Sequence, residues 1–426
     1  MAHALFLYLL VRLLLPTVRS APLGRMFVPA LLYKILMGWL MGAIFMYYYG
    51  GGDTLHYLSD ASLLAQLAYH HPPDYLRVLL GWQAPPSTLV YLNQPRALFF
   101  DKLVSVVAIL SYQNYWITSV YFSLLSFGGC WKLANALSRC YPRYRVAAAV
   151  ALLFYPSVAF WSAGILKESV AVAAIAFMVY QTQRLTAGGN SWSRTGGRVL
   201  SFLVAAWVLW QLKYYYAGVL IASLLSVVLG LQVAKRLPAV ATLGAVLMSW
   251  IGAGALLSLL HPLLSIDRLA ALLLHKHDTM VLLSDPSFMI HFSSLDGTFA
   301  SFAMNAPWAL FSAMFRPLFG EGSTFLQWMA ALENTVLLLL AGGAVAHLPR
   351  CKVSPRARWW VLVSVLYIAT LGVMLAFASP NFGSLVRYRV AFLPFLVYFI
   401  LIGNPWLTSG RLPRLFFRPP TKVNRA

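Results

Sequence analysis

The stretch FVPALLYKILMGWLMGAIFMYYYGGGDTLHY, residues 27–57, contains a predicted membrane span, a glycine run that interrupts the helix, and an acid. Residues 27–48 are mostly apolar and number enough to cross a bilayer, which takes about 20 residues in a helix. Three consecutive glycines (50–52) then let the backbone leave the helix in conformations closed to other residues. The stretch therefore predicts a helical membrane protein with a carboxylate, Asp53, just beyond its first long span.

The whole chain has the composition of a membrane protein. Of its 426 residues, 60% are hydrophobic and 10% are charged, whereas soluble domains carry roughly 25% charged residues. A net charge of +21 in a soluble chain would suggest nucleic-acid binding, but here the basic residues lie in short loops beside apolar runs. We therefore expect membrane lipid, and no nucleic acid, as a partner.

Ten segments are apolar and long enough to be predicted as membrane spans. They are 27–48, 114–135, 147–160, 169–183, 199–212, 216–233, 238–260, 325–346, 359–378 and 389–405. Residues 2–16 are a candidate eleventh span, or a helix that lies at the interface. The predicted fold is thus an all-α polytopic membrane protein with about 10 to 11 transmembrane helices, forming a single integral-membrane domain over 1–426.

Two long loops and a tail complete this organisation. Residues 50–112 form the first long outer loop, and the amphipathic run 96–110 within it is predicted to lie along the membrane surface. Residues 261–324 form the second, and its end, 302–319, is apolar enough to pack at the interface. Residues 406–426 are predicted to be a basic cytoplasmic tail that anchors to lipid headgroups.

The charges orient these spans. Six segments hold 21 of the 32 Lys and Arg residues and no acid, which predicts that they are cytoplasmic. They are 12–25, 132–145, 184–198, 235–236, 350–358 and 411–425. Alternation then puts ten of the eleven acids in outer loops and Glu333 in the outer half of a span. We expect a multi-pass protein of a bacterial inner (plasma) membrane, with its active face outward, on the periplasmic or extracellular side.

The three cysteines, Cys130, Cys140 and Cys351, fall near predicted cytoplasmic ends. They supply no outer disulfide framework, and no CxxC or Cys/His spacing typical of a metal site occurs. The sequence also lacks a phosphate-binding P-loop, a GxSxG nucleophile motif and a dinucleotide fingerprint.

Asp53 is the leading candidate for a catalytic residue. If a helix restarts after the glycines, Asp53, His56 and Asp60 share one face, because they lie at positions i, i+3 and i+7. Such a face supplies a general base, or two or three ligands for a divalent metal ion. The alternative is structural, with glycine ending one helix and Asp53 capping the next.

A second candidate lies at the outer turn of FYPSVAFWSAGILKES, residues 154–169, where Lys167 and Glu168 begin the returning helix. Ionisable groups near the membrane are costly to bury, so they usually serve a site or form a pair. The alternatives are a simple Lys–Glu pair or snorkelling toward the headgroups.

A third candidate is SPNFGSLVRYRVAFLPF, residues 379–395, in which Arg387 and Arg389 stand at the outer entrance of the last span. Arginine is disfavoured on that side, so a compensating anion is expected. Guanidinium groups bind phosphate in a bidentate way, which favours a lipid phosphate or diphosphate. Bulk headgroups or a carboxylate such as Glu333 are the alternatives.

Weaker signals also occur in the outer segments. They are Arg316 with Glu321, Lys213, Asn334 beside Glu333, and the HKHD run at His275, His277 and Asp278. HKHD has the composition of a metal cluster, although a solvated loop is the commoner meaning of such a run.

Taken together, GGDTLHY, the LKES turn and RYRVAFLPF in this architecture resemble the C-type (GT-C) membrane glycosyltransferases, which take sugars from polyprenyl-phosphate carriers. The resemblance implies a catalytic acid in the first outer loop at Asp53 and a second acid at Glu168. It also implies that Arg387 and Arg389 hold the carrier phosphate. The remaining candidates for substrate or phosphate binding are Lys167, His56, Tyr57 and Arg316.

The chain departs from that family in having a single Asp followed by histidine where many members carry paired acids, and in lacking a large soluble C-terminal domain. The resemblance predicts transfer of a sugar from a polyprenyl-linked donor to an acceptor glycan, lipid or protein. No cofactor is specified, and a divalent cation is left open. The alternatives are an O-antigen polymerase- or ligase-like enzyme, a transporter or flippase, and a non-catalytic envelope-assembly protein.

Overall fold

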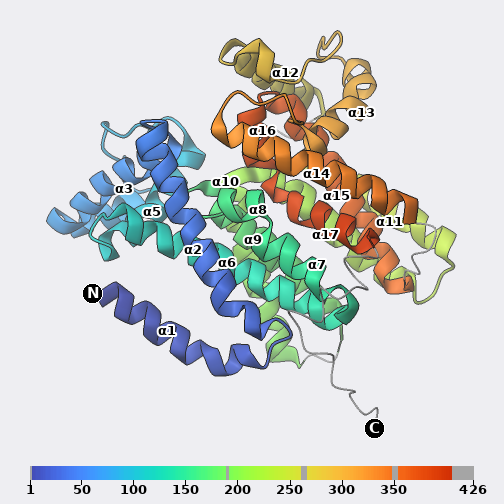
Figure 1. Ribbon diagram of the computed structural model, residues 1–426, viewed down its shortest axis with the longest axis horizontal. Helices are drawn as coiled ribbons and strands as arrows, with labels where there is room; N and C mark the ends of the chain where they lie inside the picture. Colours follow the sequence, from blue (N-terminus) through green and yellow to red (C-terminus); the bar gives the residue numbers. More distant parts are fainter. Residues whose placement is uncertain (1, 189–190, 261–265, 348–353, 405–426) are drawn as a thin grey trace. The chain divides into compact units, whose positions relative to one another are not determined.

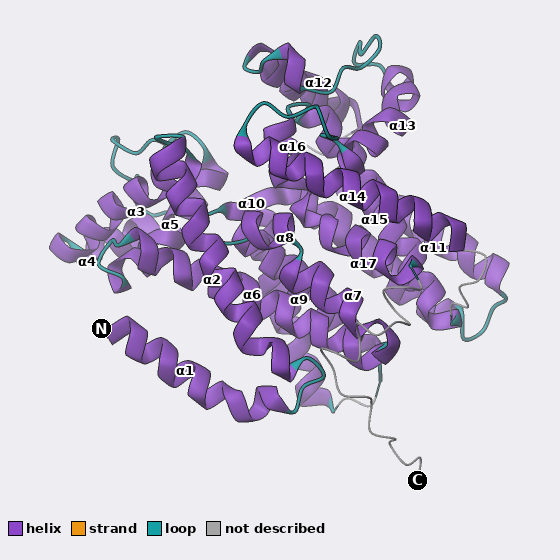
Figure 2. Cartoon of the chain, in the orientation of Figure 1, coloured by secondary structure: helices purple, strands orange, loops and turns teal. Residues whose placement is uncertain are grey.

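The protein is almost entirely helical (Figures 1 and 2). The computed structural model describes residues 2–188, 191–260, 266–347 and 354–404. Within them the only β-type pairing is an isolated bridge between Met289 and Asn381. The predicted all-α fold is therefore confirmed for the described part of the chain.

Five of the described helical segments are long and apolar enough to cross a membrane. They are Gly24–Tyr48, Trp192–Val233, Ala239–Leu259, Phe325–His347 and Pro355–Ala378. The number rises to seven if each of two bent helix pairs counts as one span. The chain is thus a polytopic membrane protein by length and composition, with fewer qualifying helices than the ten or eleven expected from the sequence.

Two features account for part of this difference. The expected span 147–160 is built from short pieces, because a five-residue α-helix and a π-helical turn precede α8 (Pro156–Trp161). The expected spans 199–212 and 216–233 instead belong to one helix, α10 (Trp192–Val233), whose backbone leaves helical geometry at Lys213. At 1.5 Å per residue, 42 residues reach about 63 Å, twice the hydrocarbon thickness of a bilayer. This helix therefore has the length for both expected spans.

The described residues cluster into two compact units. Unit 1 comprises 2–177 and 207–213, and unit 2 comprises 178–206 and 214–404. Besides α8, the helices that begin in unit 1 are α1 (Ala2–Arg19), α2 (Phe27–Ala43), α3 (Asp53–His70), α4 (Pro72–Leu80), α5 (Pro95–Leu110), α6 (Tyr115–Cys140), α7 (Arg145–Ala149) and α9 (Lys167–Thr186).

Helix α2 packs closely against α6 in unit 1. Gly38 and Gly42 lie one turn apart on α2, and a Cβ atom at either would collide with α6, at Ser123 or at the ring of Tyr115. Small residues at this spacing let two membrane helices approach closely. A π-helical turn, Ile44–Tyr48, continues α2 to the break predicted at the glycines.

The region 50–112, expected to be a loop, holds three helices, α3 to α5. The amphipathic run 96–110 is helical as predicted, but α5 packs along α3. Its buried positions recur at helical spacing and lie against Tyr57 and Ala61 of α3. Packing on a protein neighbour thus explains the apolar face that the sequence assigned to the membrane surface.

Unit 2 contains α11 (Ala239–Leu260), α12 (Ile266–Leu282), α13 (Phe299–Phe315), α14 (Phe325–His347), α15 (Pro355–Ala378), α16 (Phe382–Tyr388) and α17 (Leu393–Gly403). Helix α13 packs against α15, and α14 packs against α17. The expected last span, 389–405, begins with a bend of 76° between α16 with its following turn and α17. The tail 406–426 and Cys351 lie outside the described residues.

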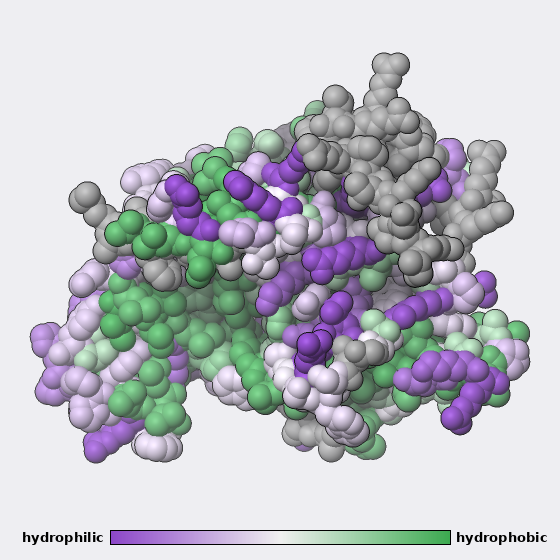
Figure 3. Space-filling model, turned by 90° about the horizontal axis from the view of Figure 1, so that it is seen from below, coloured by the Kyte–Doolittle hydropathy of each residue, from purple (hydrophilic) through white to green (hydrophobic). Residues whose placement is uncertain are grey.

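Large apolar side chains remain uncovered on several helices, as expected where lipid replaces water. On α11 they include Val240, Met248 and Leu259, which are 83%, 69% and 85% exposed. Figure 3 shows hydrophobic residues in broad green areas on one face, with hydrophilic residues in separate groups. Surfaces of this kind are unstable in water and suit a lipid environment.

Candidate functional site

Asp53 is the first residue of α3, directly after the glycine break. The N-cap position belongs to Gly52, whose φ of 136° is a conformation that other residues rarely adopt. The alternative interpretation of Asp53 as the N-cap is therefore wrong. Its carboxylate lies in the first turn, where the helix dipole favours negative charge, and its side chain is partly exposed.

The predicted face of Asp53, His56 and Asp60 is present, and all three residues contact Tyr91. The Tyr91 hydroxyl donates to Asp53 Oδ1 at 2.8 Å. The exposed His56 ring lies edge-on to the Tyr91 ring, with 6.3 Å between centroids. The backbone N–H groups of Val90 and Tyr91 donate to the two oxygens of Asp60, each at 2.9 Å. The sequence did not indicate Tyr91, because nothing local links it to α3.

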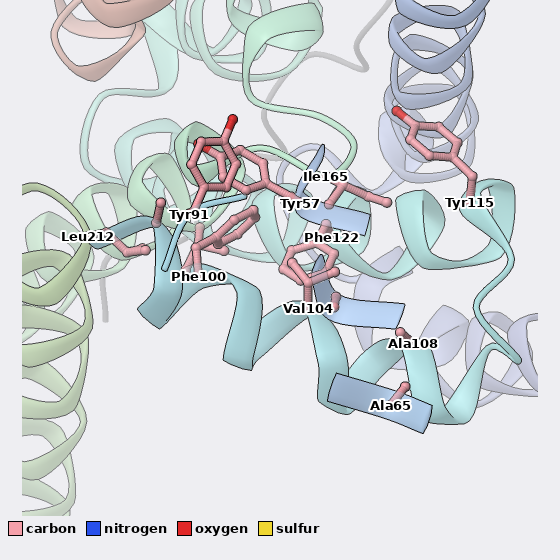
Figure 4. Packing of buried hydrophobic residues seen from close by; sticks show 13 residues of the cluster. Tyr57, Ala65, Tyr91, Phe100, Val104, Ala108, Tyr115, Phe122, Ile165 and Leu212 are labelled. Carbon is pink, nitrogen blue, oxygen red and sulfur yellow. The ribbon is translucent and has the colours of Figure 1, made fainter. Parts of the chain in front are cut away.

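Aromatic side chains pack against Tyr91 and hold it beside α3. Tyr57 is buried, with its ring centroid 5.0 Å from that of Tyr91 and 4.8 Å from that of Phe100 on α5 (Figure 4). The ammonium of Lys167 lies 5.3 Å from the Tyr57 ring centroid, within the range of a cation–π interaction. Tyr57 and Lys167, both candidates for substrate binding, therefore contact each other in unit 1.

Glu168 is fully buried and forms an ion pair with Lys213 of α10, at 2.7 Å between Oε1 and Nζ. Lys213 is itself 5% exposed and stands where the helical backbone of α10 is interrupted. The sequence marked both residues but did not pair them. The expected alternative paired Glu168 with the adjacent Lys167, whereas the structure pairs it with Lys213. A buried ion pair favours a structural role for Glu168 over that of a second catalytic acid.

Asp101 is an acid that the sequence did not single out. It is fully buried on α5, and neither carboxylate oxygen has a hydrogen-bond partner among the described residues. Asp60 and Lys167 are near enough to act on its charge electrostatically. A buried polar group without a partner is costly, and such groups gather at functional or strained sites.

In unit 2, the guanidinium of Arg316 binds Glu321 through two nitrogens, at 2.8–3.1 Å. It also lies over the rings of Trp308 and Phe382, 5.0 and 4.9 Å from their centroids. One acid and two aromatic rings thus engage the guanidinium, and the side chain is 13% exposed. The geometry therefore favours a structural role for Arg316 over the expected phosphate contact.

Arg389 is fully buried, which does not favour the predicted role of an open phosphate-binding group for this residue. Its Nη2 donates to the side-chain oxygen of Asn334, and its Nη1 donates to the backbone carbonyl of Arg316 at 3.2 Å. Asn334 in turn donates to the carbonyl of Pro317 at 2.9 Å. Arg389 thereby holds the turn after α13 against α14.

Arg387 differs from Arg389 because it is partly exposed, and its guanidinium lies 5.8 Å from the Tyr388 ring centroid. Arg316 is also partly exposed, but its guanidinium is bound to Glu321, whereas Arg389 is fully buried. The structure gathers Asp53, His56 and Tyr57 with Lys167 in unit 1, and Arg387 belongs to unit 2.

Within the described residues, no group of three or more His, Cys, Asp and Glu side chains could hold a metal ion. In the HKHD run, His277 is partly buried, and its Nδ1 lies 3.2 Å from the backbone carbonyl oxygen of Phe377. The pKa of His277 is lowered, chiefly by burial.

No family model, curated protein or solved structure matches this chain.

Proposed function

We propose that the protein is a membrane glycosyltransferase that uses a polyprenyl-phosphate- or diphosphate-linked sugar at the outer face of a bacterial inner membrane. The observation that carries the proposal is the state of Asp53, a partly exposed carboxylate in the first turn of a helix just beyond a membrane span. Three nearby acids, Asp60, Asp101 and Glu168, are fully buried, and Asp74 of α4 is paired with Arg77.

In the proposed reaction, Asp53 accepts the proton of an acceptor hydroxyl while the oxygen of that hydroxyl bonds to the anomeric carbon of the donor. The bond between that carbon and the phosphate oxygen breaks, and the polyprenyl phosphate leaves with the electron pair. A lipid-linked donor needs no nucleotide-binding domain. Arg387 is the proposed contact for the carrier phosphate, because the residue is partly exposed while Arg389 is fully buried.

The test uses the full chain in proteoliposomes with a panel of polyprenyl-phosphate-linked hexoses and an extract of envelope glycans as acceptor. Release of polyprenyl phosphate is measured. Asp53→Asn should lower the rate at least about 100-fold, the usual contribution of a general base. Asp74→Asn is the matched control, because Asp74 is a partly exposed acid of α4 whose one ion-pair partner in the described part of the chain is the exposed Arg77. Equal rates for Asp53→Asn and the unaltered protein would rule out this function.

A transporter or flippase for a lipid-linked solute is the second candidate, and the buried cation Lys34 favours it. Lys34 lies within α2, is 5% exposed, and its ammonium donates to Ser162 Oγ at 2.5 Å and to the carbonyl of Ala159 at 3.2 Å. Charges inside membrane helices, facing interrupted helices, are typical of transport pathways. In the same proteoliposomes, transport moves the donor between leaflets with its sugar–phosphate bond intact, whereas transfer breaks that bond.

A further inference from the structure

Asp53 is held by a residue far away in the chain. Tyr91, in the loop of residues 81–94 between α4 and α5, donates its hydroxyl proton to Asp53 Oδ1 at 2.8 Å. A hydrogen bond to the charged form of a carboxylate stabilises that form, and it also fixes the side-chain rotamer. Both effects concern a group that has to be ionised and aimed at an acceptor.

Tyr91 is itself fixed at both ends. Asp60 accepts the backbone N–H of Tyr91 and that of Val90, one with each oxygen, so both carboxylate oxygens are occupied by the loop. The ring of Tyr91 packs against Tyr57, and it is 8% exposed. Asp60 belongs to α3, two turns after Asp53, so α3 fixes the loop that in turn holds the first residue of α3.

We infer that Tyr91 is a positioning residue for Asp53 and that Asp60, through the backbone of the 81–94 loop, sets the position of Tyr91. This inference rests on the proposed function for its catalytic meaning, but the geometric link between the three residues does not. Asp60 reaches Asp53 through Tyr91, because both of its oxygens accept backbone N–H groups of the loop that carries Tyr91.

The first measurement is independent of activity. A carbodiimide modifies the protonated form of a carboxyl group, and mass spectrometry of the full-length protein after digestion gives the extent of modification at Asp53 against pH. In Tyr91→Phe, the modification curve should move to higher pH by about one unit, because the charged form loses a hydrogen bond. Asp60→Asn should move it in the same direction, because one of the two loop N–H groups loses its acceptor.

Tyr75→Phe is the matched control. Tyr75 is also a buried tyrosine in this region, and its hydroxyl bonds to Ser105 Oγ at 3.0 Å without touching an acid. It loses the same atom, so its Asp53 curve should coincide with that of the unaltered protein. A Tyr91→Phe curve that also coincides with it, in protein of unchanged elution and melting temperature, would overturn the inference.

The second measurement is the pH profile of polyprenyl phosphate release. Activity that needs ionised Asp53 falls as the pH drops, and in Tyr91→Phe this acid limb should move upward with a roughly tenfold lower maximal rate. A merely structural role would lower the rate at every pH without moving the limb. If Asp53→Asn is inactive and the Tyr91→Phe limb is unmoved, this inference fails alone; if Asp53→Asn is fully active, the proposed function fails, while the modification curve still tests the link to Tyr91.

Discussion

The acids of unit 1 and the arginines of unit 2 show the same difference in burial between two charged residues that are close in sequence. In each unit one charge is enclosed and bound by neutral groups of the protein, as Asp60 is by two backbone N–H groups and Arg389 by Asn334 and a carbonyl. A second charge close by in sequence, Asp53 or Arg387, stays partly exposed. Each of these motifs thus contains one enclosed charged residue and one partly exposed charged residue, and only the partly exposed residue is proposed to meet a ligand.

The strongest way to break this comparison is to remove the enclosed arginine. Arg389→Ala leaves Asn334 Oδ1 and the carbonyl of Arg316 without their donors in a buried place, and should cost about 3–5 kcal/mol of stability. Thermal unfolding in detergent, followed by fluorescence-detected size-exclusion chromatography, measures the loss.

Arg387→Ala is the control in the same motif. Because Arg387 is partly exposed, its removal should change stability by about 1 kcal/mol or less, and its main effect should fall on use of the lipid-linked donor. Equal destabilisation by the two substitutions would mean that burial does not separate their roles.

The sequence predicted the positions of the helices better than the tertiary contacts between them. Long apolar runs fixed α2, α6, α14 and α15 to within a few residues, because a bilayer-spanning helix requires about 20 apolar residues whatever it packs against. The break in the helix before Asp53 was also predictable from the local sequence, because three consecutive glycines precede that residue. These features need no knowledge of tertiary structure.

The contacts that define the candidate site depend on the packing of distant segments. Tyr91 lies 38 residues from Asp53, and the sequence contains no signal that the 81–94 loop returns to α3. Asp101 belongs to a run whose period matched a surface helix equally well, so its burial was predictable only with α3 as its partner. A sequence marks charged groups, but it does not show what surrounds them.

A smaller effect is expected at the buried ion pair of unit 1. Glu168→Gln leaves the Lys213 ammonium enclosed without its counter-charge, and Lys213→Met does the same to the carboxylate, so each should cost about 3 kcal/mol. The double substitution should be more stable than either single one, because it buries no unpaired charge. The melting temperatures of the four proteins measure the coupling, and additive losses would show that the pair does not act as a unit.

Asp101→Leu also tests the comparison of buried charges, but here we expect an increase in stability, and the smallest change of those described. Asp101 is as deeply buried as Asp60 and Arg389, yet among the described residues its oxygens have no hydrogen-bond partner. Leucine has a similar volume and no polar atom to desolvate, so the substitution should stabilise the protein by about 1 kcal/mol. The melting temperature should rise by a few degrees.

The activity of Asp101→Leu then shows why an acid occupies that position. A buried carboxyl that has no hydrogen-bond partner among the described residues costs stability, and such a cost is retained where a site uses the group. Lys167, which lies near Asp101 and over Tyr57, would lose the influence of that acid. A more stable protein with slower release of polyprenyl phosphate would extend the candidate site to Asp101, whereas a less stable one would show that the carboxyl is satisfied after all.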